Sequence, residues 1–341
     1  MTKVKIGIVG LGRLGRLGRK HAENIAFRVP NAELAAVCSI IKEEVDEIQN
    51  AWGIKYGYYD FDEMLKNQEL DAIFVSSPSG EHCRQIEAAL DAGFHVFSEK
   101  PLGITIEECI LAEKAVERHA DKVFMLGFMR RFDDSYRYAK QKIQEGAIGK
   151  PFLIRCYGLD PIKAIQGAIT FAETSGGIFL DMAIHDFDLA RWYLESEVRS
   201  MYSVGGCFAY QEFGKFQDAD NAATLVQFQN DAIGLFYAGR TCAHGYHIET
   251  EIVGTEGSLR IGTIPIKNQV AVFNENGAVF ECSSGFLERF EAAYLNELLE
   301  FVDCIQENRK PEVTVYDGTK ATRIAYAATE SFRDNKLVFL D

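Results

Sequence analysis

The sequence lacks both long apolar runs and paired cysteines. No stretch approaches the ~18 consecutive apolar residues that a transmembrane helix needs, so no membrane span is expected. The eight cysteines occur singly and form no C-x-x-C pair, which argues against a disulfide framework and predicts reduced thiols in a cytoplasmic protein. The first residues, MTKVKIGIVG, run directly into a strand pattern, so no signal peptide is expected.

Basic charge is also scarce. Lys and Arg number 36 against 50 Asp and Glu, and the net charge of −14 argues against nucleic acid or an anionic membrane as a partner. The negative net charge does not exclude a cofactor that carries phosphate, because a local site of backbone groups binds phosphate even on an acidic protein. The length of 341 residues suits two domains, and the apolar fraction of 47% is ordinary for a soluble enzyme.

Short apolar strands alternate with helical periods over residues 1–127. One helical segment, 106–119, opens with Thr105 and Glu108 in the pattern of a capping box. This alternation predicts βαβ units in a doubly wound parallel sheet, and hence a Rossmann-type α/β domain. The expected strands are Val4–Val9, Leu34–Cys38, Ala72–Val75, His95–Phe97 and Val123–Leu126.

The pattern changes over residues 128–341, where most segments alternate with period two. In one of them Thr224, Val226 and Phe228 share a face. We expect an α+β domain with a large, mainly antiparallel, open-faced sheet and helices on one side. The expected strands are 152–157, 199–205, 222–228, 232–238, 247–253, 258–261, 270–273 and 279–282, and the expected helices 133–145, 178–194, 286–307 and 318–333. Either the helices cover the sheet completely or apolar positions such as Phe208, Phe236 and Phe273 leave a face for a second subunit.

A glycine motif follows the first strand. Gly10, Gly12 and Gly15 form G-x-G-x-x-G, which predicts a dinucleotide site at a helix N-terminus. Because Leu-Gly-Arg occurs three times in tandem, a second register that ends at Gly18 is also possible. Ser39 stands where NAD-binding proteins usually carry an acidic residue, so either NADP is used or Glu43 or Glu44 takes the acidic role.

Asp181 and His185 lie four residues apart in the segment GGIFLDMAIHDFDLARW, residues 176–192, on one face of the expected helix. Burying such a pair is costly without partners. Three interpretations remain: a hydrogen-bonded core pair, a metal site that includes Asp188, or the acid/base end of an active site. No cluster of Cys or His accompanies the pair, so no metal is expected.

The motifs together resemble the Gfo/Idh/MocA family of oxidoreductases, and most closely its inositol 2-dehydrogenase branch. They are the glycine motif, Glu99-Lys100-Pro101, the segment GFMRRFD at residues 127–133, and Asp181-x-x-x-His185. The resemblance implies NAD or NADP as cofactor, a homotetramer, and oxidation of a cyclic polyol, myo- or scyllo-inositol, to the inosose. The alternatives are a dehydrogenase or reductase of glucose, galactose or a related aldose, and a regulatory protein that binds NAD(P) without turnover.

The family's catalytic set maps onto Lys100, Asp181 and His185. His185 suits the general base, Lys100 would stabilise charge on the reacting oxygen, and Asp181 would contact substrate and orient the others. The expected cofactor-binding residues are Gly10, Gly12, Arg13, Leu14, Gly15, Ser39, Ser77, Pro78, Glu99 and Lys100. The expected substrate-binding residues are Lys100, Arg130, Asp160, Asp181, His185, His244 and Tyr246.

Overall fold

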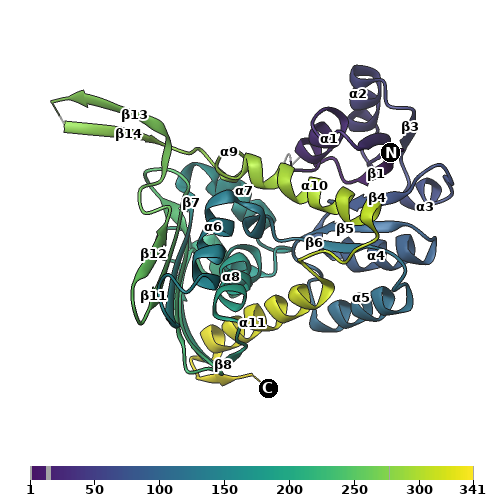
Figure 1. Cartoon of the computed structure of the whole chain (residues 1–341). Helices are drawn as coiled ribbons and strands as arrows, with labels where there is room; N and C mark the ends of the chain where they lie inside the picture. Colours follow the sequence, from purple (N-terminus) through teal and green to yellow (C-terminus); the bar gives the residue numbers. More distant parts are fainter. Residues whose placement is uncertain (1, 13–16, 276, 341) are drawn as a thin grey trace. The chain divides into compact units, whose positions relative to one another are not determined.

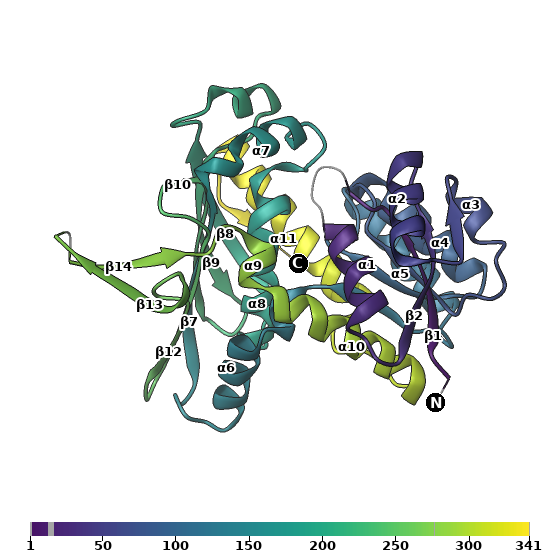
Figure 2. The same ribbon diagram turned by 90° about the horizontal axis from the view of Figure 1, so that it is seen from above.

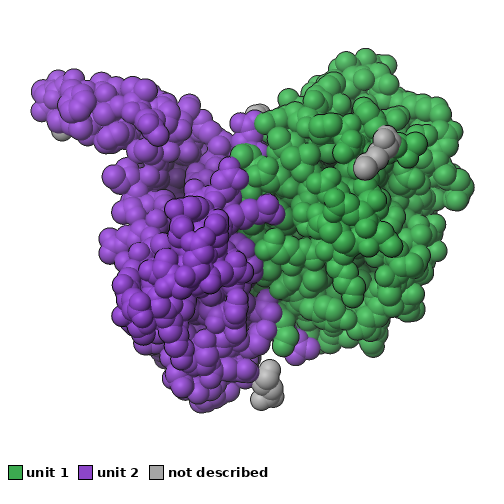
Figure 3. All heavy atoms as spheres, in the orientation of Figure 1, with its two compact units in different colours: residues 1–132, 292–322 green, residues 133–291, 323–341 purple. Residues whose placement is uncertain are grey.

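A six-stranded parallel sheet forms the centre of the first of two units in this computed structural model, which describes residues 2–12, 17–275 and 277–340. Unit 1 comprises Met1–Phe132 and Ala292–Thr322, and unit 2 comprises Asp133–Glu291 and Arg323–Asp341 (Figure 3). The strand order in unit 1 is β3-β2-β1-β4-β5-β6, which is the doubly wound order of dinucleotide-binding domains. The strands are β1 Val4–Val9, β2 Ala32–Cys38, β3 Tyr56–Tyr58, β4 Ala72–Val75, β5 His95–Glu99 and β6 Phe124–Gly127.

The helices of unit 1 follow the predicted alternation. They are α1 Leu17–Phe27, α2 Lys42–Trp52, α3 Phe61–Met64, α4 His82–Asp91 and α5 Ile106–Arg118. The predicted capping box is confirmed, because the Thr105 side chain accepts from the backbone of Glu108 and the Glu108 side chain accepts from the backbone of Thr105. Each of these bonds satisfies a backbone N–H that has no partner inside the helix.

Unit 1 also takes a segment from far along the chain. Most of α10 (Glu291–Glu307) and the first part of α11 (Val315–Asp334) belong to it. Phe301 of α10 meets Phe97 of β5 edge to face at 5.6 Å, and Phe97 stacks on Phe74 of β4 at 4.4 Å. The periodicity predicted the apolar stripe of α10, but it did not identify the sheet on which this stripe packs. The boundary predicted at residue 127 lies close to the first break between the units, at 132.

Unit 2 is built on a seven-stranded sheet in the order β12-β11-β7-β10-β9-β8-β15. The pair β7 and β10 is parallel and the other pairs are antiparallel, so the predicted mainly antiparallel sheet is confirmed. The strands are β7 Pro151–Pro161, β8 Val198–Gly206, β9 Asn221–Phe228, β10 Ile233–Cys242, β11 His247–Gly254, β12 Ser258–Ile261 and β15 Val338–Phe339.

Helices pack on one face of this sheet, as Figures 1 and 2 show for α6 (Asp134–Gln144), α7 (Ile165–Phe171) and α8 (Ile184–Leu194). Thr224, Val226 and Phe228 of β9 are buried, as the alternation predicts. Phe236 was wrongly predicted to supply the open face, because it is buried and meets Phe187 of α8 edge to face at 5.1 Å.

A two-stranded arm stands apart from this sheet. β13 (Ile266–Asn274) and β14 (Gly277–Cys282) pair only with each other and extend away from the seven-stranded sheet in Figures 1 and 2. Phe273 is 81% exposed on this arm, so it does not belong to the large sheet's open face, where it was expected. Phe208 is exposed in the loop after β8. The short helix α9 (Phe286–Arg289) follows the arm.

Candidate functional site

The loops after β1, β2 and β4 meet at the carboxyl edge of the parallel sheet. Gly10 N–H donates to Cys38 O at 3.0 Å, and the hydroxyl of Ser76 donates to Gly10 O at 2.6 Å. Gly10 and Gly12 have φ of 87° and 70°, which L side chains rarely adopt. A Cβ on Gly10 would lie 2.5 Å from the backbone of Ser76, so only glycine fits this turn.

Gly18 is the last glycine of the second possible register of the motif. It is the second residue of α1, and a Cβ there would lie only 1.9 Å from Gly10 O. This is the close approach of helix to strand that the last glycine of a dinucleotide motif permits. The second register of the Leu-Gly-Arg repeat is therefore the one that the described residues support. The predicted Arg13, Leu14 and Gly15 lie outside the described residues.

These features fit a dinucleotide. Gly10 and Gly12 place no side chain of their own between the backbone turn and an incoming ligand, and α1 follows from Leu17. Its first N–H groups and the positive end of the helix dipole favour a pyrophosphate. In such a site Gly10 and Gly12 would approach the pyrophosphate, while residues at the ends of β4 and β5 would border the rest of the cofactor.

Ser39 follows β2 and is buried. Its hydroxyl donates to Oε2 of Glu44 at 2.8 Å and accepts from Ile41 N–H at 3.2 Å. Glu44 lies in the first turn of α2. A carboxylate from the following helix, that of Glu44, therefore lies at the end of β2, whereas Ser39 itself is neutral.

The loops after β4 and β5 are joined by His82. One ring nitrogen lies 2.8 Å from Ser77 O and the other 2.8 Å from Pro101 O. Burial lowers the pKa of His82. The hydrogen bonds to the two carbonyl groups act in the opposite direction, because they favour the protonated imidazole. Pro78 follows Ser77 directly, and the Lys100–Pro101 peptide bond is cis. His82 therefore fixes the backbone of both loops that carry predicted cofactor-binding residues.

Lys100 is half-buried and follows Glu99, the last residue of β5. Its backbone N–H donates to Oε2 of Glu99 at 3.2 Å. Arg130, a predicted substrate contact, is buried in the short 3-10 helix Met129–Phe132 after β6. Both cations therefore follow carboxyl ends of parallel strands, where ligands of such sheets bind.

In unit 2 the segment 178–194 is helical, as predicted, but its first part is not a regular α-helix. Phe179–Ala183 forms a π-helical turn that contains Asp181, and α8 starts at Ile184. The four-residue step from Asp181 to His185 therefore spans a change of helical geometry, and the α-helical i,i+4 rule does not describe the pair. Single π turns inside helices occur frequently at functional sites.

Arg240 holds Asp181, a contact that the sequence interpretation missed. Nη1 of Arg240 donates to Oδ2 of Asp181 at 3.0 Å, and Nη2 lies 3.9 Å from Oδ2 of Asp218. Arg240 is 2% exposed at its side chain, whereas Asp181 is 23% exposed. Burial raises the pKa of Asp218, while the N–H of Ile178 and the charge of Arg240 oppose this shift. Strand alternation offers the signal, since it puts Arg240 on the buried face with Phe236 and Ala238.

The other predicted unit 2 residues gather at the same end of the sheet as Arg240. Leu159 of β7 pairs with both Gly239 and His247, so Asp160 lies beside the loop between β10 and β11. In this loop His244 is exposed and its Nε2 lies 3.1 Å from Nδ1 of His247. The neighbouring Tyr246 is buried edge to face against Phe290 at 6.3 Å. His185 is the second residue of α8 and is 7% exposed.

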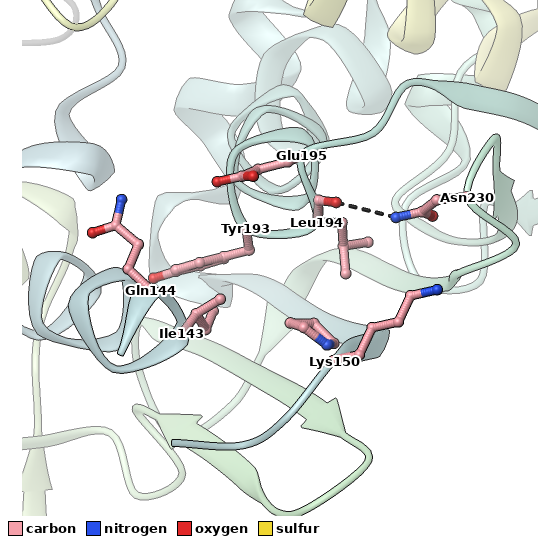
Figure 4. A pocket seen from close by; sticks show the side chains of 8 residues that line it. Ile143, Gln144, Lys150, Tyr193, Leu194, Glu195 and Asn230 are labelled. Carbon is pink, nitrogen blue, oxygen red and sulfur yellow. Dashed lines mark hydrogen bonds between the residues drawn. The ribbon is translucent and has the colours of Figure 1, made fainter. Parts of the chain in front are cut away.

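A pocket at the far end of α8 contains none of these residues. It lies between the ends of α6 and α8, and the amide of Asn230 donates to Leu194 O at 3.1 Å across it (Figure 4). Leu194 is nine residues after His185, about 14 Å along a helix that rises 1.5 Å per residue. This pocket therefore belongs to the capping of α8 rather than to the predicted site.

Two family models cover most of the chain. One is described as an oxidoreductase family with an NAD-binding Rossmann fold and matches residues 4–128; the other is the GFO/IDH/MocA C-terminal domain and matches residues 136–260. The chain belongs to the Gfo/Idh/MocA family of oxidoreductases. Membership confirms both predicted domain folds and the NAD(P) cofactor. No helix in the described parts of the chain is long and apolar enough to cross a membrane.

Relatives within the Gfo/Idh/MocA family align along nearly the whole chain. Scyllo-inositol 2-dehydrogenase (NAD(+)) of Bacillus subtilis is 36% identical over 99% of this chain and 97% of its own length. Myo-inositol 2-dehydrogenase of Thermotoga maritima is 31% identical over 99% of both chains. A crystal structure of scyllo-inositol dehydrogenase from Lactobacillus casei, with bound NAD(H) and scyllo-inositol, is 44% identical over 99% of both chains with a TM-score of 0.95.

Proposed function

We propose that this protein oxidises a secondary hydroxyl of a cyclic polyol, scyllo- or myo-inositol, to the inosose with NAD as the hydride acceptor. The observation that carries the proposal is the likeness, at 44% identity over 99% of both chains, to a scyllo-inositol dehydrogenase that binds NAD(H) and scyllo-inositol. The curated relatives from Bacillus subtilis and Thermotoga maritima are also named as inositol 2-dehydrogenases.

Lys100, Asp181 and His185 form the catalytic set of this proposal. NAD, when bound, accepts the hydride that leaves the substrate carbon. An imidazole nitrogen of His185 takes the hydroxyl proton, so that the oxygen's electron pair forms the carbonyl bond as the hydride departs. The ammonium group of Lys100 stabilises the negative charge that develops on this oxygen. Asp181, fixed by Arg240 at 3.0 Å, orients substrate hydroxyls.

In this proposal unit 1 binds the cofactor, and unit 2 binds most of the substrate and forms the contacts between subunits. Arg130 in unit 1 and Asp160, His244 and Tyr246 in unit 2 are the further polyol contacts. These groups combine donors and acceptors, which a ring with several hydroxyls requires. We place the enzyme in the cytoplasm, since all eight cysteines are free thiols and six of them are buried.

The proposal is tested by a panel of substrates with purified protein. We expect scyllo- or myo-inositol to reduce NAD with the highest kcat/KM, followed through the absorbance of the reduced nicotinamide. A higher kcat/KM with glucose, galactose or a related aldose would show that the substrate is a sugar and not inositol. Binding of NAD without turnover of any of these compounds would favour the regulatory protein.

Glu44 is expected to make NAD the preferred cofactor. Its carboxylate, held by Ser39 at 2.8 Å, occupies the end of β2, where ribose hydroxyls are bound and a 2′-phosphate would be repelled. Glu44→Gln should lower the ratio of kcat/KM for NAD to that for NADP by about tenfold or more, since like-charge contacts cost several kcal/mol. Glu43→Gln is the matched control, because Glu43 is adjacent and exposed. Equal effects of both substitutions, or a wild type that prefers NADP, would contradict this role of Glu44.

The open face of the seven-stranded sheet is proposed to bind further copies of the chain, in a homotetramer. Tyr202, Leu225 and Leu235 stand opposite one another on β8, β9 and β10, and they are 36%, 53% and 38% exposed. Val204, Ile233 and Tyr237 extend this apolar surface. Apolar patches of this kind usually mark interfaces, and the antiparallel sheet offers the same surface on every copy.

Leu225→Glu is expected to reduce the molar mass in solution, measured by light scattering after size exclusion, from four chains to fewer. The new charge would have to be buried without a partner, which costs several kcal/mol. Leu111→Glu serves as the control, because Leu111 is 52% exposed on α5 in unit 1. A wild-type monomer, or a tetramer that survives Leu225→Glu, would place the interface elsewhere.

A further inference from the structure

Two carboxyl groups and an imidazole lie together inside unit 1, away from solvent. His21 of α1, Glu99 of β5 and Glu297 of α10 are 0%, 5% and 0% exposed. Nε2 of His21 lies 2.7 Å from Oε1 of Glu99 and 3.9 Å from Oε1 of Glu297. One potential ligand atom from each residue lies within 4.8 Å of the other two. Two buried carboxyl groups this close cannot both be ionised without a large cost in free energy.

Aromatic rings surround this cluster. The ring of His21 lies 4.5 Å from that of Phe74 and 5.4 Å from that of Tyr294. Both carboxyl oxygens of Glu297 and Nδ1 of His21 lack a hydrogen-bond partner among the described residues. A buried carboxyl group in such surroundings is costly for stability, and packing alone does not require it. The burial of Glu297 therefore suggests that it has a functional role through the residues that it contacts.

Glu99 connects the cluster to Lys100. Oε1 of Glu99 lies 2.7 Å from Nε2 of His21, and Oε2 accepts a hydrogen bond from the backbone N–H of Lys100 at 3.2 Å. Gly127, which pairs with Glu99 across β5 and β6, leaves room for this carboxylate, since a Cβ there would lie 3.3 Å from Oε2. The orientation of the Glu99 carboxylate therefore bears directly on the backbone from which Lys100 projects.

We propose that His21 and Glu297 are positioning residues, which together fix the Glu99 carboxylate and through it the backbone of Lys100. This role rests on the proposed function, in which Lys100 stabilises charge on the substrate oxygen. His21 donates from Nε2 to Oε1 of Glu99. One oxygen of Glu297 lies within 4.8 Å of the Glu99 carboxylate. Burial and the charge of Glu99 raise the pKa of Glu297 well above its usual range, so Glu297 keeps its proton and brings an O–H group, rather than a second negative charge, to the side of Glu99.

A divalent metal ion is the competing explanation for this cluster, because one imidazole and two carboxylates are common ligands of zinc. The two explanations differ in the charge of Glu297. A metal ligand must be ionised, whereas a donor to Glu99 must be neutral. Glutamine has the shape of a protonated glutamate and keeps a donor, so it separates the two cases.

The test compares Glu297→Gln and Glu297→Leu in the full-length enzyme. Glu297→Gln should retain kcat within about threefold, whereas Glu297→Leu should lower kcat about tenfold with the KM for NAD unchanged, because a small misplacement of a catalytic group slows the chemical step. His21→Phe, which keeps a ring beside Phe74, should resemble Glu297→Leu.

Glu307→Leu is the control, because Glu307 is exposed near the end of the same helix. A wild type that oxidises inositol while Glu297→Leu loses stability but keeps its kcat would overturn the positioning role and leave the proposed function intact. A divalent metal that copurifies in stoichiometric amount with the wild type and is lost in Glu297→Gln would overturn it in favour of a metal site.

Discussion

His185→Ala is expected to lower kcat by about 10²- to 10⁴-fold, the usual contribution of a positioned general base. Hydride can leave the substrate carbon only as the hydroxyl proton is removed, and water is a poor substitute for imidazole as the base. His185 is buried at the start of α8, directly after the π-helical turn that carries Asp181. The measurement is kcat for inositol at saturating NAD.

The pH dependence of the same variant adds a second measurement. Because a base must be unprotonated to act, kcat/KM of the wild type should fall as the pH decreases, and His185→Ala should lose this acidic limb. Added imidazole should restore part of the activity of the variant. His119→Ala is the control, since His119 pairs with Asp91 in unit 1. Near wild-type turnover in His185→Ala would assign the base to another group.

Lys100→Met is expected to lower kcat by about 10²- to 10³-fold, which is the range found when one stabilising donor is removed from a reacting oxygen. Methionine preserves most of the length and apolar body of the side chain but removes its charge. The dissociation constant of NAD should change much less than kcat, because in the proposed site the glycine turn and the start of α1, and not Lys100, would bind the pyrophosphate. Stopped-flow measurement of a single turnover separates the chemical step from product release.

Two further variants test whether the effect of Lys100→Met comes from the loss of its ammonium group. Lys100→Arg should recover only part of the activity, since the planar guanidinium places its donors differently from an ammonium group. Lys66→Met is the matched control, because Lys66 is exposed in the same unit and pairs with Glu63. If Lys100→Met keeps a normal kcat and changes only the KM for NAD, Lys100 binds the cofactor and does not act on the substrate oxygen.

Local sequence signals predicted much of this molecule. The alternation of strands and helices up to residue 127 identified the parallel sheet, because both periods reflect which faces are buried. The capping box at Thr105 and Glu108 was predicted because its hydrogen bonds join residues three apart. Period-two burial likewise identified every strand from β7 to β14 to within a few residues. Each of these features is decided by neighbours in the sequence.

Features that depend on distant segments were not predictable in the same way. The π-helical turn at Phe179–Ala183 leaves no period of its own in so short a stretch. The ion pair of Arg240 with Asp181 joins residues 59 positions apart, and the packing of Phe301 on Phe97 joins α10 to a sheet near the start of the chain. The glycine register was ambiguous because the repeat also permits a register that ends at Gly18, and the close approach of Gly18 to Gly10 depends on how helix and strand pack.

Transfer of a label from substrate to cofactor tests the proposed reaction most directly. Scyllo-inositol deuterated at its ring carbons would be incubated with the enzyme and NAD, and the reduced cofactor examined by mass spectrometry and proton NMR. We predict one deuterium at C4 of the nicotinamide for each inosose formed, together with a lower rate than with unlabelled inositol when a single turnover is followed. Reduced cofactor without deuterium, or inositol left unchanged by an enzyme that binds NAD, would contradict the proposed hydride transfer.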